Sequence, residues 1–199
     1  MKYESIADIY TANDKIRERF LGTISGVSET EATVLPDGEK WTIQQLVEHI
    51  GIVENSVSRL CTKLVGGAKA GGKLASGGIG VSPETIAKWA QSAGEKLEAP
   101  ERVRPTGGVS IAEALEQMDT NREAFDALRA DLETYDMSEP KFPHPYFGGL
   151  SATEWLILAG GHTARHTAQI GRLLEKIRAK KGPAERRGFS RVKRHQTGS

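Results

Sequence analysis

The sequence predicts an all-α fold, a bundle of four long helices. In four separate segments apolar residues recur every three to four positions, and none of these segments alternates apolar and polar residues as a half-buried strand does. Three of them begin with a hydroxyl residue followed three positions later by Glu or Gln, the capping box that marks a helix start. With 38% hydrophobic and 27% charged residues, the 199-residue chain has the composition of a globular protein with one core.

The first two helices are expected near the N-terminal end of the chain. The first runs from about Ser5 to Ser25, and Gly26 follows it, as glycine commonly does just past a helix C-terminus. The second runs from about Thr42 to Val65, and the box Thr42–Gln45 satisfies amides at its start. Gly66–Gly67 stand at the expected end of this second helix.

The third and fourth helices are expected in the C-terminal half. The third runs from Ser110, which forms a capping box with Glu113, to about Thr134. The fourth runs from Ser151, which forms a box with Glu154, to about Ala179. Residues 1–179 are therefore expected to form one domain that contains all four helices.

The second and third helices are joined by a crossover of more than forty residues, far longer than a tight hairpin needs. It opens with the glycine-rich segment Gly66–Gly80, a candidate lid, and continues with a short helix expected from Ser82 to about Leu97, with Pro83 in its first turn. A connection of this length can return the chain to its starting end, so the second and third helices could be parallel.

Composition also limits where the protein works and what it contacts. The single cysteine, Cys61, excludes an internal disulfide and lies in phase with a core-facing stripe, which favours a buried, inert thiol in a reducing cytoplasm. No secretory signal or membrane-length apolar run is visible, so a cytoplasmic protein without membrane contact is expected. Residues 180–199 hold seven Lys and Arg against one Glu, and we expect a solvated, disordered basic tail. Among the functions considered for this protein, we rank nucleic-acid binding by this tail last.

Three of the five histidines fall on core-facing helical positions. His49 is in phase with the apolar stripe of the second helix, and His162 and His166 lie four apart on one face of the fourth. Burying three imidazoles costs free energy unless each finds a partner, and one shared metal ion would satisfy all three. The alternative is that each is a core histidine bonded to a backbone carbonyl or a neighbouring side chain.

Three segments carry a resemblance to a known family. Glu39–Ile50 resembles the Trp-Ser/Thr-to-His segment of the DinB-like superfamily, and Tyr10–Asn13 resembles its first helix. His144–Trp155, continuing through the two later histidines to Gln169–Ile170, is similar to the family's last helix and the loop before it. The resemblance covers residues 1 to about 179 and leaves the glycine-rich segment and the tail unmatched.

The resemblance implies an up-down-down-up four-helix bundle with a divalent metal ion held by His49, His162 and His166. It also implies a homodimer. Some relatives are transferases or isomerases that use a low-molecular-weight thiol, others are described as metal-dependent hydrolases, and many have no assigned reaction. The resemblance therefore predicts the metal site more firmly than it predicts the reaction.

Three neutral ligands would leave the metal ion an open position for water or substrate, which is typical of a catalytic site. Such an ion lowers the pKa of bound water or of a thiol, so hydrolysis of, or thiol transfer to, a small electrophilic substrate are both accessible. Zinc or nickel is expected from imidazole ligation, although iron and copper also accept it. The alternative is a non-catalytic bundle in which the ion only ties two helices together, with a stress-related or interaction role.

No general base stands out from the sequence. Glu154 and Gln45 fit helix-capping roles. Asn13 either faces the site or is a buried amide bonded to backbone, and Gln169 either orients an imidazole or lies on the surface. His144 either borders the pocket or is exposed in its loop, and we exclude it as a ligand.

Overall fold

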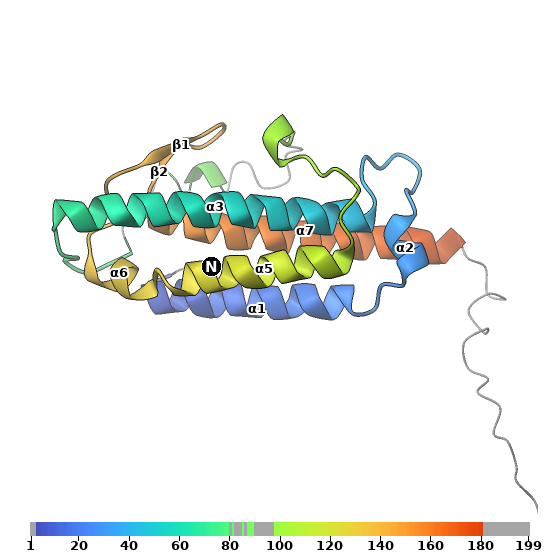
Figure 1. Ribbon diagram of the computed structural model, residues 1–199, viewed down its shortest axis with the longest axis horizontal. Helices are drawn as coiled ribbons and strands as arrows, with labels where there is room; N and C mark the ends of the chain where they lie inside the picture. Colours follow the sequence, from blue (N-terminus) through green and yellow to red (C-terminus); the bar gives the residue numbers. More distant parts are fainter. Residues whose placement is uncertain (1–2, 80, 82–84, 86, 90–97, 181–199) are drawn as a thin grey trace, which may run out of the picture.

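The computed structural model describes residues 3–79, 81, 85, 87–89 and 98–180 of the chain. Four long helices lie side by side: α1 (Ile6–Ile24), α3 (Ile43–Gly71), α5 (Ile111–Asp126) and α7 (Ala152–Lys180). In Figure 1, α1 and α7 run in one direction and α3 and α5 in the other. The predicted up-down-down-up four-helix bundle, with parallel second and third helices, is confirmed.

The predicted helix starts are stabilised by the expected side chains. Thr42 and Ser110 each form a complete capping box, at the starts of α3 and α5. At the start of α7, the backbone amide of Ser151 donates to Glu154 Oε2 at 2.9 Å, and the Glu154 amide donates to Ser151 Oγ at 3.3 Å. Glu154 and Gln45 therefore act as caps, because their side chains satisfy amides that a helix start leaves without partners.

The predicted end of the second helix is wrong. Helix α3 continues through Gly66 and Gly67 to Gly71, and it ends at Gly72, whose left-handed φ of 67° is favourable only for glycine. Gly67 has a packing role instead, because a Cβ there would lie 2.9 Å from Pro140 Cγ. The glycine pair lets a loop approach the helix closely and does not terminate it.

The predicted third helix is interrupted. Helix α5 ends at Asp126 and a shorter helix, α6 (Arg129–Thr134), follows it. At the break the Leu128 amide donates to Phe125 O, a bond to the third rather than the fourth preceding residue, which tightens the turn. Apolar residues stay in phase across this turn, so periodicity alone predicts one continuous helix.

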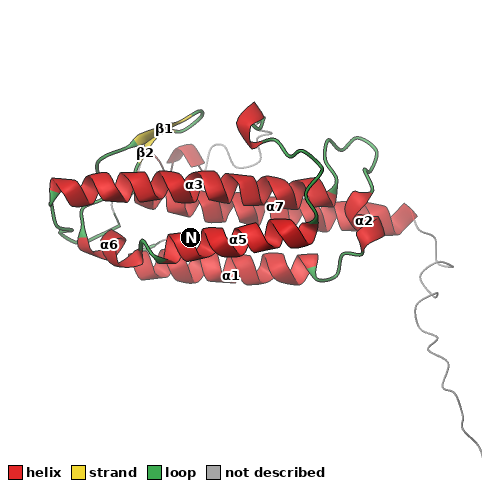
Figure 2. Ribbon diagram, viewed as in Figure 1, coloured by secondary structure: helices red, strands yellow, loops and turns green. Residues whose placement is uncertain are grey.

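Several short elements were not predicted. They are α2 (Glu29–Thr33), the 3₁₀ helix η1 (Glu101–Val103), and a hairpin of β1 (Phe142–His144) and β2 (Gly148–Leu150), the yellow strands in Figure 2. Ser28 forms a capping box with Glu31 at the start of α2, a signal that the sequence contained.

Two other predictions concern parts of the chain that the structure does not describe. The short helix expected from Ser82 to about Leu97 lies largely outside the described residues, although residues 85 and 87–89 within it are helical. Residues 181–199 of the basic tail also lie outside them. Among the described helices, none combines the length and apolar character needed to cross a membrane.

The only cysteine lies in the core that the helices enclose. Cys61 is 1% exposed, and its Sγ lies 3.6 Å from Ala152 O. Burial raises the pKa of this thiol to about 12. The prediction of a buried, inert thiol is confirmed, because the reactive form of cysteine is the thiolate.

We expect Gly160→Ala to lower the free energy of unfolding by about 1–3 kcal/mol, the usual cost of overpacking a core. A Cβ at Gly160 on α7 would lie 2.0 Å from Asn13 Oδ1 on α1. Gly161→Ala is the matched control, because no atom lies within 4 Å of a Cβ there and alanine favours the helix. Urea unfolding of both variants tests this, and equal stability would show that α1 and α7 do not need this close approach.

Candidate metal centre

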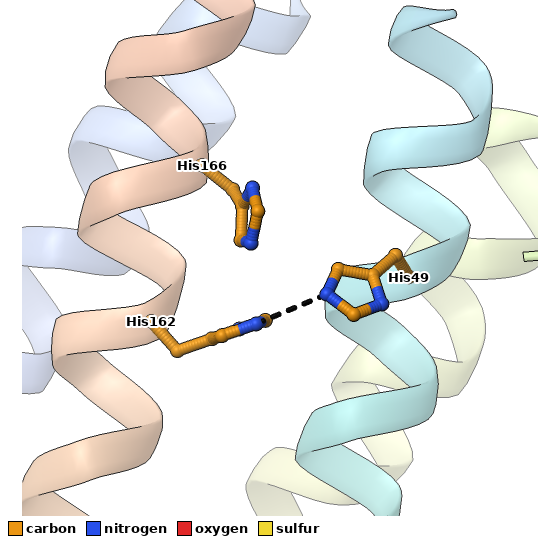
Figure 3. A group of neighbouring side chains, drawn as sticks. All are labelled: His49, His162 and His166. Carbon is orange, nitrogen blue, oxygen red and sulfur yellow. Dashed lines mark hydrogen bonds between the residues drawn. The ribbon is translucent and has the colours of Figure 1, made fainter. Parts of the chain in front are cut away.

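Helices α3 and α7 bring together the three histidines singled out in the sequence. His49 on α3 points at His162 and His166 on α7, as Figure 3 shows. Each offers one ring nitrogen, and these three atoms lie within 4.8 Å of one another. His49 Nε2 and His162 Nε2 are 3.1 Å apart. Among the described residues this group includes no cysteine or carboxylate.

Local sequence explains why these side chains face the interior. His49 lies in the second turn of α3 between Leu46 and Ile50, which are completely buried, so the helix turns its imidazole inward. His162 and His166 are one helical turn apart and share a face of α7. His49 is 3% exposed and His166 9%.

Hydrogen bonds fix which nitrogen of two imidazoles carries the proton. His49 Nδ1 lies 2.7 Å from Val103 O in η1, and His166 Nδ1 lies 2.9 Å from Gln169 Oε1. Because both oxygens only accept, each Nδ1 donates its hydrogen and each Nε2 keeps a lone pair. Of the two alternatives left open for Gln169, the structure supports the one in which it orients an imidazole.

The part of the chain that the structure describes does not satisfy both ring nitrogens of His162. Its Nδ1 is buried and has no hydrogen-bond partner among the described residues. If its Nε2–H donates to His49 Nε2, the lone pair on Nδ1 has no donor, and otherwise two Nε2 lone pairs face each other. A cation between the rings removes this conflict. Nitrogens bound to tetrahedral zinc at about 2.0–2.1 Å are about 3.3 Å apart, so the 3.1 Å separation fits a shared ion.

The environment keeps all three imidazoles neutral. Burial lowers the pKa of His49, and burial followed by the charges of His166 and His49 lowers the pKa of His162 well below its usual range. Burial, with His49 as the next cause, lowers the pKa of His166 to about 4. Neutral imidazole is the form that binds metal ions, so the ligands are ready to bind at neutral pH.

A buried carboxylate that the sequence analysis missed supports the site from outside. Glu48, 3% exposed, accepts hydrogen bonds from the Thr106 amide and hydroxyl at 2.8 and 2.7 Å and from the Gly107 amide at 2.8 Å. These bonds hold the end of the crossover against α3 beside His49, where Val103 also reaches the imidazole. No local signal marks Glu48, because its partners are 58 and 59 residues away.

The remaining candidates lie outside the histidine group. His144 in β1 is half-buried, so of the two alternatives left open for it the exposed position is wrong. Its ring stacks on Phe147 with centroids 4.5 Å apart. Burial lowers the pKa of His144 to about 4. Asn13 donates to Leu156 O at 3.3 Å, which supports the alternative of an amide bonded to backbone.

Comparison with known proteins agrees with this fold. The chain is similar to the uncharacterized protein YuaE of Bacillus subtilis (strain 168), with 26% identity over 155 residues that cover 77% of this chain and 90% of that protein. The fold of this chain matches the crystal structure of TT2238, a four-helix bundle protein, with a TM-score of 0.55. The match has 20% identity and covers 84% of this chain and 99% of the other. The sequence profile of the DinB superfamily matches residues 12–170. The chain therefore belongs to the DinB superfamily, as its motifs suggested.

Proposed function

We propose that this protein binds one divalent transition-metal ion through His49, His162 and His166, and that it is a metal-dependent enzyme. The observation that carries the proposal is the group of three inward-facing, neutral imidazoles, to which no described carboxylate or thiolate is added. Zinc or nickel is the proposed ion, because imidazole nitrogen suits both.

The proposed reaction is hydrolysis, or transfer of a thiol to a small electrophilic substrate. When bound to three neutral ligands, the ion keeps an open position and lowers the pKa of the water or thiol that fills it. The chain's own part is to hold the rings, since Val103 O and Gln169 Oε1 fix two of them. The buried Cys61 cannot serve as the thiol, so thiol transfer requires a separate low-molecular-weight thiol.

Cobalt(II) substitution tests whether the metal position is open. The protein is loaded with Co²⁺, whose visible spectrum reports its ligands, and titrated with 2-mercaptoethanol and with azide. A saturable spectral change with either ligand is expected, and thiol-transfer and hydrolase substrates are then screened on the zinc and nickel forms. A spectrum that neither ligand changes would contradict the enzyme proposal.

A closed metal shell would support the second candidate, a non-catalytic bundle. The observation that favours it is that all three ligands come from only two helices, α3 and α7, which a metal ion would tie together. In that case metal loading raises the thermal unfolding temperature while the cobalt spectrum stays insensitive to added ligands.

We expect Gln169→Ala to lower the metal affinity by about 10- to 100-fold, the usual effect of removing a group that orients a ligand. The substitution removes the oxygen that accepts from His166 Nδ1, so this ring loses its fixed orientation. Competition with a chromophoric chelator measures the affinity. Gln117→Ala, on the exposed face of α5, is the control, and an equal affinity in both variants would exclude an orienting role.

A further inference from the structure

A second polar site lies inside the bundle, away from the three histidines. It is a cavity of about 50 Å³ that all four long helices line. Asn13 and Arg17 reach it from α1, Glu54 from α3, Arg122 from α5 and Thr163 from α7. A space of this size can hold a few water molecules, since one needs about 10–15 Å³.

The cavity contains a buried acceptor that lacks a donor among the described residues. Thr163 Oγ1 donates to Glu54 Oε1 at 2.8 Å. Asn13 Nδ2 donates to Leu156 O, which fixes the orientation of the amide, and Asn13 Oδ1 is buried without a donor among the described residues. The amide oxygen and the Glu54 carboxyl group therefore share one cavity, in which the Thr163 hydroxyl already donates to Glu54. A buried acceptor without a donor costs free energy.

The nearby cations are engaged elsewhere. Arg17 pairs with Asp119 and Arg122 pairs with Asp14, which joins α1 to α5 at the cavity, and Arg122 also pairs with Asp126 within α5. They also disfavour a metal ion in the cavity, because it would face two guanidinium groups. The charged and titratable groups around Glu54 are Tyr10, Asp14 and Arg17 from α1 and Asp119, Arg122 and Asp126 from α5, with only Thr163 facing it from α7.

We propose that Glu54 is a proton-operated latch that fastens α1 to α3 and α7. In the protonated state its O–H supplies the missing donor, directly or through cavity water, to Asn13 Oδ1 on α1, while Thr163 on α7 still donates to the other oxygen. When the proton leaves to solvent, two acceptors face each other and α1 is held less firmly. Burial raises the pKa of Glu54 to about 7, against the opposing effects of Thr163, Arg17 and Arg122, so the latch operates near neutral pH.

The sign of the effect follows from the raised pKa. The folded state keeps the Glu54 proton at pH values where the unfolded chain, with an ordinary pKa of 4.5, has lost it. The stability from this proton is complete below pH 4.5 and is lost as the pH rises through about 7. Between pH 5 and 7 the unfolding equilibrium constant should rise by roughly 40-fold from this group. Four histidines with lowered pKa values act in the opposite direction: His49, His144, His162 and His166.

The ratio of wild type to Glu54→Gln isolates the latch from the histidines. Urea unfolding of the full chain without added metal, at pH 5 to 8, gives both unfolding constants. The wild-type constant divided by that of Glu54→Gln should rise roughly 40-fold from pH 5 to 7 and level off near pH 8. The same ratio for Glu123→Gln, an exposed glutamate on α5, should stay constant. A flat ratio for Glu54→Gln would overturn the proposal.

Two further measurements test the proton and the latch directly. Infrared spectra of the folded wild type should show a protonated carboxyl C=O band that disappears near pH 7, even if Glu54→Gln does not fold. Amide hydrogen exchange, corrected for intrinsic rates, should show α1 opening more readily at pH 8 than at pH 6 relative to α3. Absence of the band, or equal opening of α1 at both pH values, would contradict the latch.

Discussion

Wild-type protein dialysed without chelator is expected to retain close to one equivalent of a transition metal, whereas His49→Ala and His162→Ala retain almost none. His162 shows why the effect should be large. Its Nδ1 has no partner among the described residues and its Nε2 faces His49 Nε2, so an ion between the two Nε2 atoms would remove the conflict of their lone pairs. Removing one of three imidazoles should weaken binding by about 1000-fold, because the free energy of metal binding is shared among few ligands. Elemental analysis measures the metal content.

His144→Ala is the matched control for this experiment. Its imidazole is also half-buried and neutral, but it stacks on Phe147 and does not belong to the histidine group, so this variant should retain the metal. Circular dichroism checks that every variant is folded. A wild type that is metal-free and cannot be loaded with zinc or nickel would mean that the three histidines are core residues, and the proposed function would fall with them.

Local features of the fold could be predicted from sequence because they depend on neighbouring residues. The capping box of Ser151 and Glu154 acts within one turn, and the phase of His49 among apolar residues is a property of one helix. Features that depend on distant residues could not be predicted. Gly67 looks like a helix terminator until Pro140 is seen to pack against it.

The same distinction applies to the site. The positions of the three histidines follow from helix periodicity, and Gln169 is only three residues from the ring that it orients. Val103, by contrast, contacts His49 from 54 residues away, across the crossover. The sequence thus predicts which groups could bind the metal, while the groups that fix their orientation depend largely on how the crossover returns to α3.

Glu48→Ala is expected to lower the free energy of unfolding by about 3 kcal/mol, because three donors lose a buried, charged acceptor. One of them is the Gly107 amide, in a turn whose φ of 79° requires glycine, so the chain cannot easily rearrange there. Glu48→Gln should lower the free energy of unfolding less than Glu48→Ala does, because its amide oxygen still accepts a hydrogen bond. Some stability is still lost, because its NH₂ group faces a donor on the other side. Urea unfolding compares the two variants.

Glu113→Ala separates this effect from the simple loss of a carboxylate. Glu113 accepts from the amide and hydroxyl of Ser110 at an exposed helix start, so its removal should cost only about 1 kcal/mol and leave metal affinity unchanged. Glu48→Ala should also weaken metal binding by about 10-fold, because the segment that carries Val103 O would no longer be fixed against His49. If Glu48→Ala is no more harmful than Glu113→Ala in stability and metal affinity, the crossover is held by its apolar contacts and not by this carboxylate. If both properties fall together, one buried acid links the folding of the crossover to the orientation of the metal ligand.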